Sequence, residues 1–163
     1  MKHMLPVALA ALLGTSALAP AALAQDKVSL VVNAVQIFGT VDPAKVNDYT
    51  EYMAIVNLYD ALTTVDATGA VVPQLAESWE ISDDSKTYTF KLKADATFQD
   101  GSPVEAKDVV YSMQRLLAIN EGPAYLFTGL VEPDAVKALD DHTVEITLNR
   151  VYAPFISNTP LIL

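Results

Sequence analysis

The fold is decided by the stretch TYTFKLKADATFQDGSPVEAKDVVYSMQRLL, which spans residues 87–117. At its start, apolar side chains alternate with polar ones at Tyr88, Phe90 and Leu92. This period of two predicts a half-buried strand. Just upstream, Trp79 and Ile81 alternate in the same way, and the polar residues 83–86 separate the two runs. Together they predict a β-hairpin with one aromatic face turned inward.

The second half of the stretch predicts a helix that follows a tight turn at Asp100-Gly101. Ser102 has the character of an N-cap, Pro103 that of a first helical residue, and Glu105 follows the cap by three positions. The apolar side chains recur at helical spacing and are Ala106, Val109, Val110, Met113 and Leu117. We therefore expect one amphipathic helix in this part of the stretch.

Two more hairpins are predicted on either side of this stretch. The turn residues 66–69 separate two short β-prone segments. Downstream, the residues Val144, Ile146 and Leu148 alternate after the polar turn 140–142. This part of the chain therefore combines β-hairpins with one long helix.

The order of elements changes upstream of residue 63. Val28–Val35 is an almost unbroken apolar run, as expected of a strand that is covered on both faces of an α/β sheet. A loop at Asp42-Pro43 follows, and Asp48 with Glu51 predicts a capping box. The next apolar residues have helical spacing and are Tyr52, Ile55, Val56, Tyr59 and Leu62. This region therefore predicts strand, loop and helix, the order of an α/β fold.

Residues 1–24 have the pattern of a secretory signal peptide. Lys2 precedes an Ala/Leu-rich run, and Ala22-Leu23-Ala24 is a small-x-small cleavage site. The run is shorter than the roughly 20 residues that a membrane-spanning helix needs. We expect export and cleavage after Ala24, with no lipid anchor because the sequence has no cysteine. At the other end, the apolar runs Ala153-Pro154-Phe155-Ile156 and Leu161-Ile162-Leu163 predict that this is the N-terminal fragment of a longer chain.

Composition excludes several functional classes. The chain has 10 Lys and Arg against 20 Asp and Glu, a formal net charge of −10, which argues against nucleic acid as a partner. Without cysteine it has neither a thiolate metal site nor a thiol nucleophile. His142, the only histidine after the signal segment, lies in a predicted turn, and no Gly-x-Ser-x-Gly motif accompanies it. We therefore predict no catalytic residue, no metal site and no cofactor, and expect that the protein is not an enzyme.

The order of short motifs between residues 58 and 117 resembles one family. The motifs are Leu58-Tyr59-Asp60-Ala61-Leu62, then Leu75-Ala76-Glu77-Ser78-Trp79-Glu80, then Tyr88-Thr89-Phe90-Lys91-Leu92, then Phe98-Gln99-Asp100-Gly101-Ser102-Pro103-Val104, and finally Ala106-Lys107-Asp108-Val109-Val110-Tyr111-Ser112. In this order they are similar to the extracellular solute-binding proteins of family 5, the peptide- and nickel-type periplasmic receptors of ABC importers.

The resemblance implies a two-lobed α/β periplasmic-binding-protein fold, of which this chain covers a part. Residues 25–57 would begin the first lobe, and residues 58–163 would form most of its mixed α+β extra subdomain, which is incomplete here. The resemblance also implies a monomeric periplasmic receptor that captures a peptide or small solute and delivers it to a membrane permease.

The same resemblance places four residues at the ligand cleft: Asn47, Asp48, Tyr49 and Tyr125. The residues themselves support this in part, since Tyr49 and Tyr125 are predicted in loops outside any apolar stripe, where they can cover a ligand and bond its polar groups. Asp48 has two open interpretations, contact with a positive ligand group or capping of the following helix. A secreted hydrolase or chaperone-like protein whose active residues lie beyond residue 163 is the alternative function.

Overall fold

A computed structural model describes residues 39–162. The signal segment 1–24 and the predicted strand Val28–Val35 lie outside the described residues.

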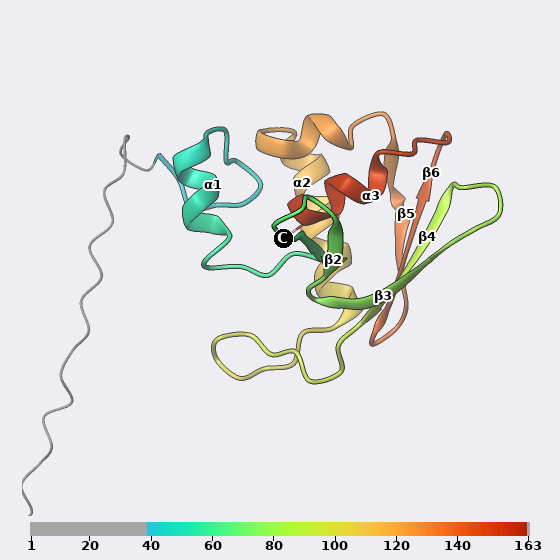
Figure 1. Cartoon of the computed structure of the whole chain (residues 1–163), viewed down its shortest axis with the longest axis horizontal. Coiled ribbons are helices and arrows are strands. Elements are labelled where there is room, and N and C mark those ends of the chain that lie inside the picture. Colours follow the sequence, from blue (N-terminus) through green and yellow to red (C-terminus); the bar gives the residue numbers. More distant parts are fainter. Residues whose placement is uncertain (1–38, 163) are drawn as a thin grey trace, which may run out of the picture. The chain divides into compact units, whose positions relative to one another are not determined.

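The centre of the described part is a four-stranded antiparallel sheet (Figure 1). Its strands follow the order β3-β4-β6-β5, with bounds Ala76–Ile81 for β3, Thr87–Leu92 for β4, Thr143–Leu148 for β6 and Val131–Asp140 for β5. The pairs β3–β4 and β5–β6 are the two hairpins that alternation predicted, and both are confirmed. A separate two-stranded sheet joins β1 (Thr63–Val65) to β2 (Val71–Pro73), which confirms the turn at residues 66–69.

The two faces of the four-stranded sheet differ sharply in polarity. On one face, Phe90 lies in register with Trp79 on β3 and with Val144 on β6. On the opposite face, Glu145 lies between Thr89 and Lys137. Because successive side chains of a strand point to opposite faces, this alternation gives the sheet one buried face and one solvated face.

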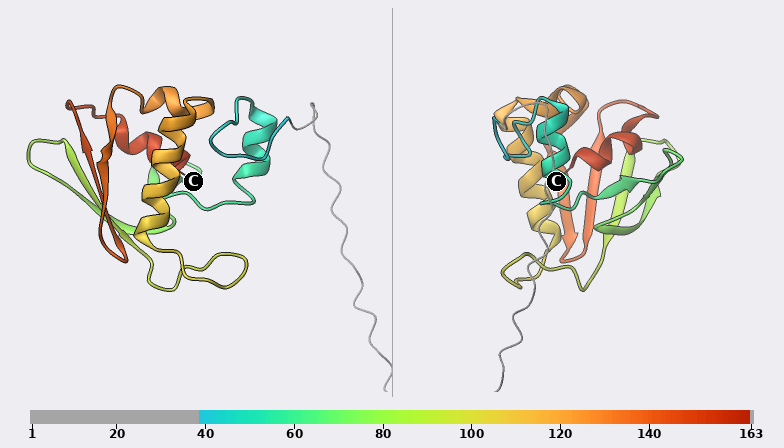
Figure 2. Two further views of the ribbon diagram at one scale, coloured as in Figure 1. Left: turned by 180° about the vertical axis from the view of Figure 1, so that it is seen from behind. Right: turned by 60° about the vertical axis from the view of Figure 1, so that its left-hand side comes forward.

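Helices cover the apolar face (Figure 2). Helix α2 (Ala106–Ile119) contributes a stripe of buried residues at Ala106, Val109, Met113 and Leu116. Helix α3 (Phe155–Asn158) adds Phe155, whose ring centroid lies 4.6 Å from that of Tyr88 on β4. The core is thus one layer of helices on one layer of sheet.

The start of α2 differs from the prediction. The helix begins at Ala106 with Glu105 as N-cap, three residues later than the predicted cap at Ser102. Pro103 instead forms a β-bridge with Thr97, and the Ser102 hydroxyl donates to Asp100 Oδ1 at 2.6 Å. The segment is therefore held in an extended hairpin, and this pairing outweighs the local helix-start signal.

Helix α1 also differs, because it spans only Tyr49–Ile55 rather than continuing to Leu62. Beyond it, the Leu62 N–H donates to the Ile162 carbonyl, and the Leu75 N–H donates to the Ala61 carbonyl. Leu62 is buried where its backbone pairs with Ile162, and not on a helix face. The helix ends shortly before Asn57, a residue type that often follows a helix C-terminus, although the apolar spacing continues to Leu62.

Two short 3₁₀ helices complete the described part, η1 (Gly122–Leu126) and η2 (Thr159–Leu161). Helix α2 ends before η1 at Asn120, whose left-handed conformation has φ 53°. Within residues 39–162, no helix is long and apolar enough to span a membrane.

Candidate functional site

The four residues predicted at a ligand site line a single hollow of about 300 Å³. Asn47 and Asp48 precede α1, Tyr49 is its first residue, and Tyr125 lies in η1. The other lining residues are Pro43, Val46, Tyr52, Ile55, Gly122, Pro123 and Leu161. The structure therefore brings together residues that are more than 70 positions apart in the sequence.

The hollow lies between η1 and the segment before α1, and these two parts of the chain approach each other closely at Gly122. A Cβ atom at this position would lie 2.9 Å from the Val46 carbonyl oxygen and 3.0 Å from that of Ala44. Gly122 also has φ +49°, a left-handed conformation that side chains disfavour. Glycine is thus required both by the backbone conformation and by the contact between η1 and the segment before α1.

Asp48 has a capping role in the structure. Its Oδ1 accepts a hydrogen bond from the Glu51 N–H at 3.0 Å, which satisfies one of the free donors at the start of α1. The reciprocal half of the predicted capping box is absent among the described contacts, because the Glu51 carboxylate accepts instead from the backbone of Gly39, Thr40 and Asn47. The prediction of a capping box is therefore right for Asp48 and wrong for Glu51.

Tyr49 and Tyr125 present most of their surface to solvent, with 75% and 77% exposed. Neither lies in a loop as predicted, since Tyr49 opens α1 and Tyr125 belongs to η1. Among the described residues that line the hollow, Asp48 alone carries a charge at neutral pH. The wall is thus apolar and aromatic, with tyrosine hydroxyls and one carboxylate as its polar groups.

Tyr52 is a lining residue that the sequence interpretation assigned only to a helix face. It follows Tyr49 by three positions, and this spacing places both side chains on one side of α1. Burial raises the pKa of Tyr52 above its usual value of 10.0, so its hydroxyl stays protonated and able to donate at neutral pH. Helical spacing from Tyr49 was the signal in the sequence that could have identified it.

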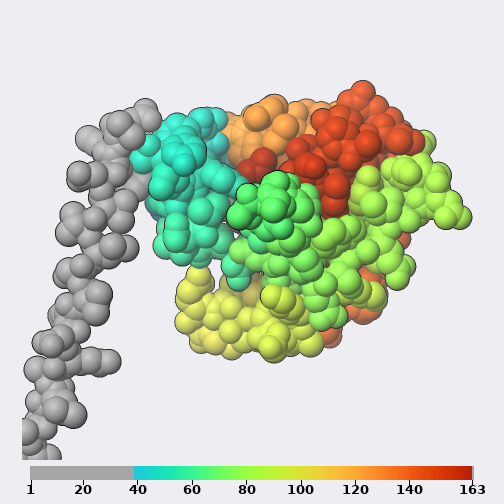
Figure 3. All heavy atoms as spheres, viewed as in Figure 1, coloured from blue at the N-terminus to red at the C-terminus, as the bar shows by residue number. Residues whose placement is uncertain are grey.

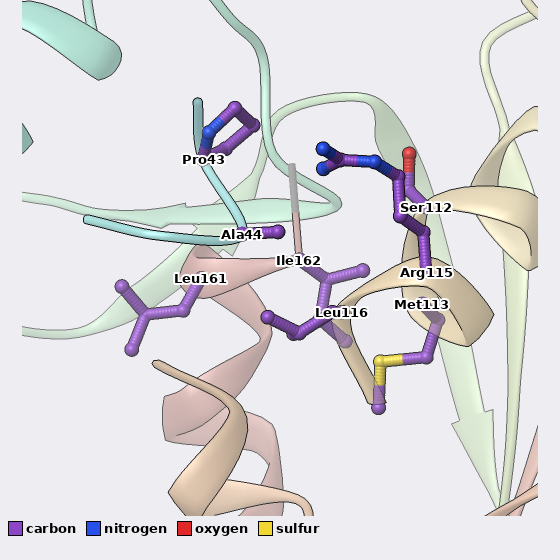
Figure 4. Close-up of a pocket in the computed structure, with 8 residues that line it drawn as sticks. All are labelled: Pro43, Ala44, Ser112, Met113, Arg115, Leu116, Leu161 and Ile162. Atoms are coloured by element: carbon purple, nitrogen blue, oxygen red, sulfur yellow. The ribbon is translucent and has the colours of Figure 1, made fainter. Parts of the chain in front are cut away.

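An ion pair holds the segment before α1 against α2. Arg115 Nη1 and Nη2 donate to Asp42 Oδ1 and Oδ2 at 2.8 and 2.6 Å. Arg115 thereby holds the pKa of Asp42 below its usual 3.8. Arg115 also lines a small cavity of about 40 Å³. Figure 4 shows its side chain near Pro43, together with Met113 and Leu116 of α2. This space has room for about one water molecule, so we assign it to packing rather than to a ligand.

The ion pair predicts a pH-dependent stability. Asp42 has a lower pKa in the folded protein than in the unfolded chain, so its ionised form stabilises the fold above about pH 3.9. That contribution is lost as the pH falls through the folded pKa. Arg115→Met is expected to lower the free energy of unfolding by about 1 kcal/mol at pH 7, and the difference from wild type should shrink toward pH 3.

Thermal unfolding across this pH range measures the effect. The control is Lys93→Met, which removes one positive charge from an exposed side chain. An Arg115→Met deficit that is as large at pH 3 as at pH 7 would contradict the assignment to Asp42.

A larger groove of about 760 Å³ lies on another side of the same segment. Several exposed apolar side chains line it, namely Val41, Val56, Leu58, Tyr59, Phe98 and Tyr111. Its lining comes in part from the α1 region and from residues 95–105, which are the blue-green and the yellow atoms in Figure 3. None of Asn47, Asp48, Tyr49 or Tyr125 lines it, so we take the smaller hollow as the candidate site.

Metal and acid–base chemistry find little support in the described residues. No group of three or more Asp, Glu or His side chains within residues 39–162 is arranged to hold a metal ion. His142 lies in the turn between β5 and β6, where its backbone N–H donates to Asp140 Oδ1 at 2.8 Å. This is the structural turn role that the sequence predicted for it.

Comparisons with known proteins found relatives along most of the chain. Residues 70–163 match the family described as Bacterial extracellular solute-binding proteins, family 5 Middle. The chain is 38% identical over 157 residues to the probable D,D-dipeptide-binding periplasmic protein DdpA of Escherichia coli, a match that covers 93% of this chain and 30% of that protein. It is 36% identical over 141 residues to the periplasmic oligopeptide-binding protein OppA of the same organism, covering 77% of this chain and 26% of that protein.

Solved structures match the described fold as well. The crystal structure of Haemophilus influenzae OppA in complex with the peptide RPPGFSPFR has a TM-score of 0.70 and 32% identity, over 76% of this chain and 28% of that one. The fold is therefore that of one region of a periplasmic binding protein, as predicted. The chain spans less than a third of the length of the curated relatives named above.

Proposed function

Because the chain belongs to family 5 of the bacterial extracellular solute-binding proteins, we propose that it is part of a receptor that captures a peptide or a related small solute. The receptor delivers this ligand to the membrane permease of an ABC importer and catalyses no reaction. The observation that carries the proposal is the shared hollow of Asn47, Asp48, Tyr49 and Tyr125.

The chemistry of the hollow suits a peptide. Exposed tyrosine rings offer apolar area at low entropic cost, and their hydroxyls bond polar groups of a ligand backbone. Asp48 has one oxygen engaged with the Glu51 N–H. Its negative charge also favours a positive group of the ligand in this otherwise uncharged wall. A volume of about 300 Å³ accommodates a few side-chain-sized groups, which fits contact with one part of a ligand.

The proposal includes the organisation and location of the protein. Residues 1–24 are a signal peptide that is cleaved after Ala24, and the product is a periplasmic monomer without a lipid anchor and without affinity for nucleic acid. Residues 25–57 begin the first lobe, and residues 58–163 form most of the extra subdomain. The names of the periplasmic relatives and the acidic, cysteine-free composition support this.

A thermal-shift panel on the complete gene product tests the function. The panel contains L-Ala-L-Ala, D-Ala-D-Ala, trialanine, the nonapeptide RPPGFSPFR and, as non-peptide competitors, a nickel–histidine chelate and a sugar. A ligand at a hundred times its dissociation constant adds about 2.7 kcal/mol to stability. We expect at least one peptide to raise the melting temperature. A response to the non-peptide ligands alone would contradict the peptide assignment.

The site has its own test in Tyr49→Ala and Tyr125→Ala. Each is expected to weaken binding of the best peptide by about 1–3 kcal/mol, as the loss of an aromatic anchor does. The melting temperature without ligand should hardly change, because both side chains are exposed. Asp48→Asn keeps much of the capping but removes the charge, so it isolates the charge contribution. Calorimetry in which both tyrosine variants bind like wild type would show that the hollow is not the ligand site.

A further inference from the structure

We propose that Glu51 is the positioning residue of the ligand hollow, holding the segment from Gly39 to Asp48 in the shape that receives the ligand. This rests on the proposed function of the hollow and adds a residue that does not line it. Glu51 touches no ligand in this proposal. It acts through three consecutive residues that line the hollow, Asn47, Asp48 and Tyr49.

The geometry of the Glu51 carboxylate carries the proposal. Only 6% of the residue is exposed, and both carboxylate oxygens accept backbone hydrogen bonds. Oε1 accepts from the N–H groups of Gly39 at 2.9 Å and Thr40 at 3.0 Å, and Oε2 accepts from the Asn47 N–H at 3.2 Å. One side chain therefore connects Gly39 and Thr40 to Asn47, near the two ends of the segment.

Apolar packing holds this segment at few points, and besides Glu51 the ion pair between Asp42 and Arg115 holds its middle part. Val41 is 49% exposed, and within residues 39–48 only Ala44 is a buried hydrophobic residue. A buried carboxylate destabilises the fold unless its oxygens are hydrogen-bonded. The three N–H groups stabilise the carboxylate, and the carboxylate in turn satisfies the three donors. The position of Asn47 is thus set by a charge-assisted contact from inside the helix that follows it.

Gly39 offers a second way to disturb this contact. A Cβ atom there would lie 2.6 Å from Glu51 Oε1, a separation that real Cβ contacts essentially never show. Any side chain at position 39 must therefore displace the carboxylate or the backbone that donates to it. Gly39→Ala should consequently disturb the same network without changing Glu51 itself.

Glu51→Gln in the complete protein tests the proposal. Glutamine has nearly the same shape, but one carboxylate oxygen becomes an NH₂ group that cannot accept, so either Asn47 or the Gly39–Thr40 pair loses its partner. We expect at least a tenfold loss of affinity, measured by calorimetry at 25 °C with the panel peptide that binds wild type most tightly. Gly39→Ala should show a loss in the same direction. The control is Glu77→Gln, the same charge change at an exposed position of β3, which should bind like wild type.

Hydrogen exchange of the ligand-free protein separates positioning from general destabilisation. In Glu51→Gln, whichever amides lose their acceptor, either Asn47 or Gly39 together with Thr40, should exchange faster than in wild type. The Tyr52 amide, which donates to the Asp48 carbonyl at 3.0 Å inside α1, should keep its rate. Equal acceleration of all four amides would mean that Glu51 merely stabilises the helix and would overturn the proposal.

The outcomes also distinguish this proposal from the proposed function. If wild type binds a peptide and Tyr49→Ala weakens it while Glu51→Gln does not, Glu51 has no positioning role and the function stands. If no panel peptide binds wild type, the proposed function fails, and the role of Glu51 in binding fails with it.

Discussion

Replacing Phe155 with alanine is expected to lower the free energy of unfolding by about 3–5 kcal/mol, the usual cost of emptying a buried phenylalanine site. Phe155 is fully buried, and its ring contacts Tyr88 at 4.6 Å and Phe127 at 6.3 Å between centroids. It therefore joins the sheet, the segment after η1 and the C-terminal helix α3. A loss of this size is a large part of the 5–15 kcal/mol that stabilises a typical domain.

Denaturant unfolding followed by fluorescence measures this loss. Trp79 is the only tryptophan of the chain, and its ring centroid lies 6.5 Å from that of core residue Phe90, so its emission reports on the sheet. Tyr111→Ala is the control, because that aromatic side chain is 67% exposed and should cost about 0.5 kcal/mol or less. Equal losses for both variants would contradict the core assignment of Phe155.

Replacing Gly122 with alanine is expected to have the second large effect. The left-handed backbone at Gly122 costs a residue with a side chain about 1–2 kcal/mol. Contacts of 2.9–3.0 Å with the backbone of residues 44–46 add an overpacking cost of about 1–3 kcal/mol. Because the obstructing atoms belong to the backbone, they yield only if the wall of the hollow moves, so peptide affinity should fall together with stability.

Gly129→Ala is the matched control for this prediction. Gly129 has φ +73°, also left-handed, but no heavy atom lies within 4 Å of its would-be Cβ. Gly129→Ala therefore has only the conformational cost. The two losses of unfolding free energy, measured by chemical denaturation, should differ by the cost of the contact with residues 44–46. Identical losses would show that the contact at Gly122 is unimportant.

Regular alternation was enough to predict the hairpins β3–β4 and β5–β6, but not their pairing into one sheet through β4 and β6. The runs through Phe90 and Ile146 alternate without interruption, and each is bounded by polar turn residues. A period of two leaves one register that buries all the apolar side chains on one face. The helical stripe of α2 was predictable for the same reason, since Ala106, Val109 and Met113 repeat at helical spacing and are buried.

Local capping signals were a poorer guide than periodicity. The Ser102-Pro103 signal is as strong as the one that α2 uses at Glu105, but Pro103 pairs with Thr97 instead. Phe98, an aromatic residue of the same segment, is 43% exposed on the rim of the larger groove. The pairing of Thr97 with Pro103 therefore outweighs the helix-start signal, although both lie in the same short segment.

The sequence by itself determined the family, the two hairpins, the long helix and the four residues to examine for ligand binding, because each of these depends on motifs or on periods that short segments carry. Only the tertiary structure decided that Tyr125 lies across one hollow from Asn47, Asp48 and Tyr49, since this requires η1 to pack against the backbone of residues 44–46 at Gly122. It also decided that Glu51 bonds Gly39, 12 residues away, instead of capping its own helix. The physical reason is the same in both cases. A buried polar group bonds whichever partner the fold brings near, and a close backbone contact forms wherever two segments pack. Neither partner can be identified from its distance along the sequence.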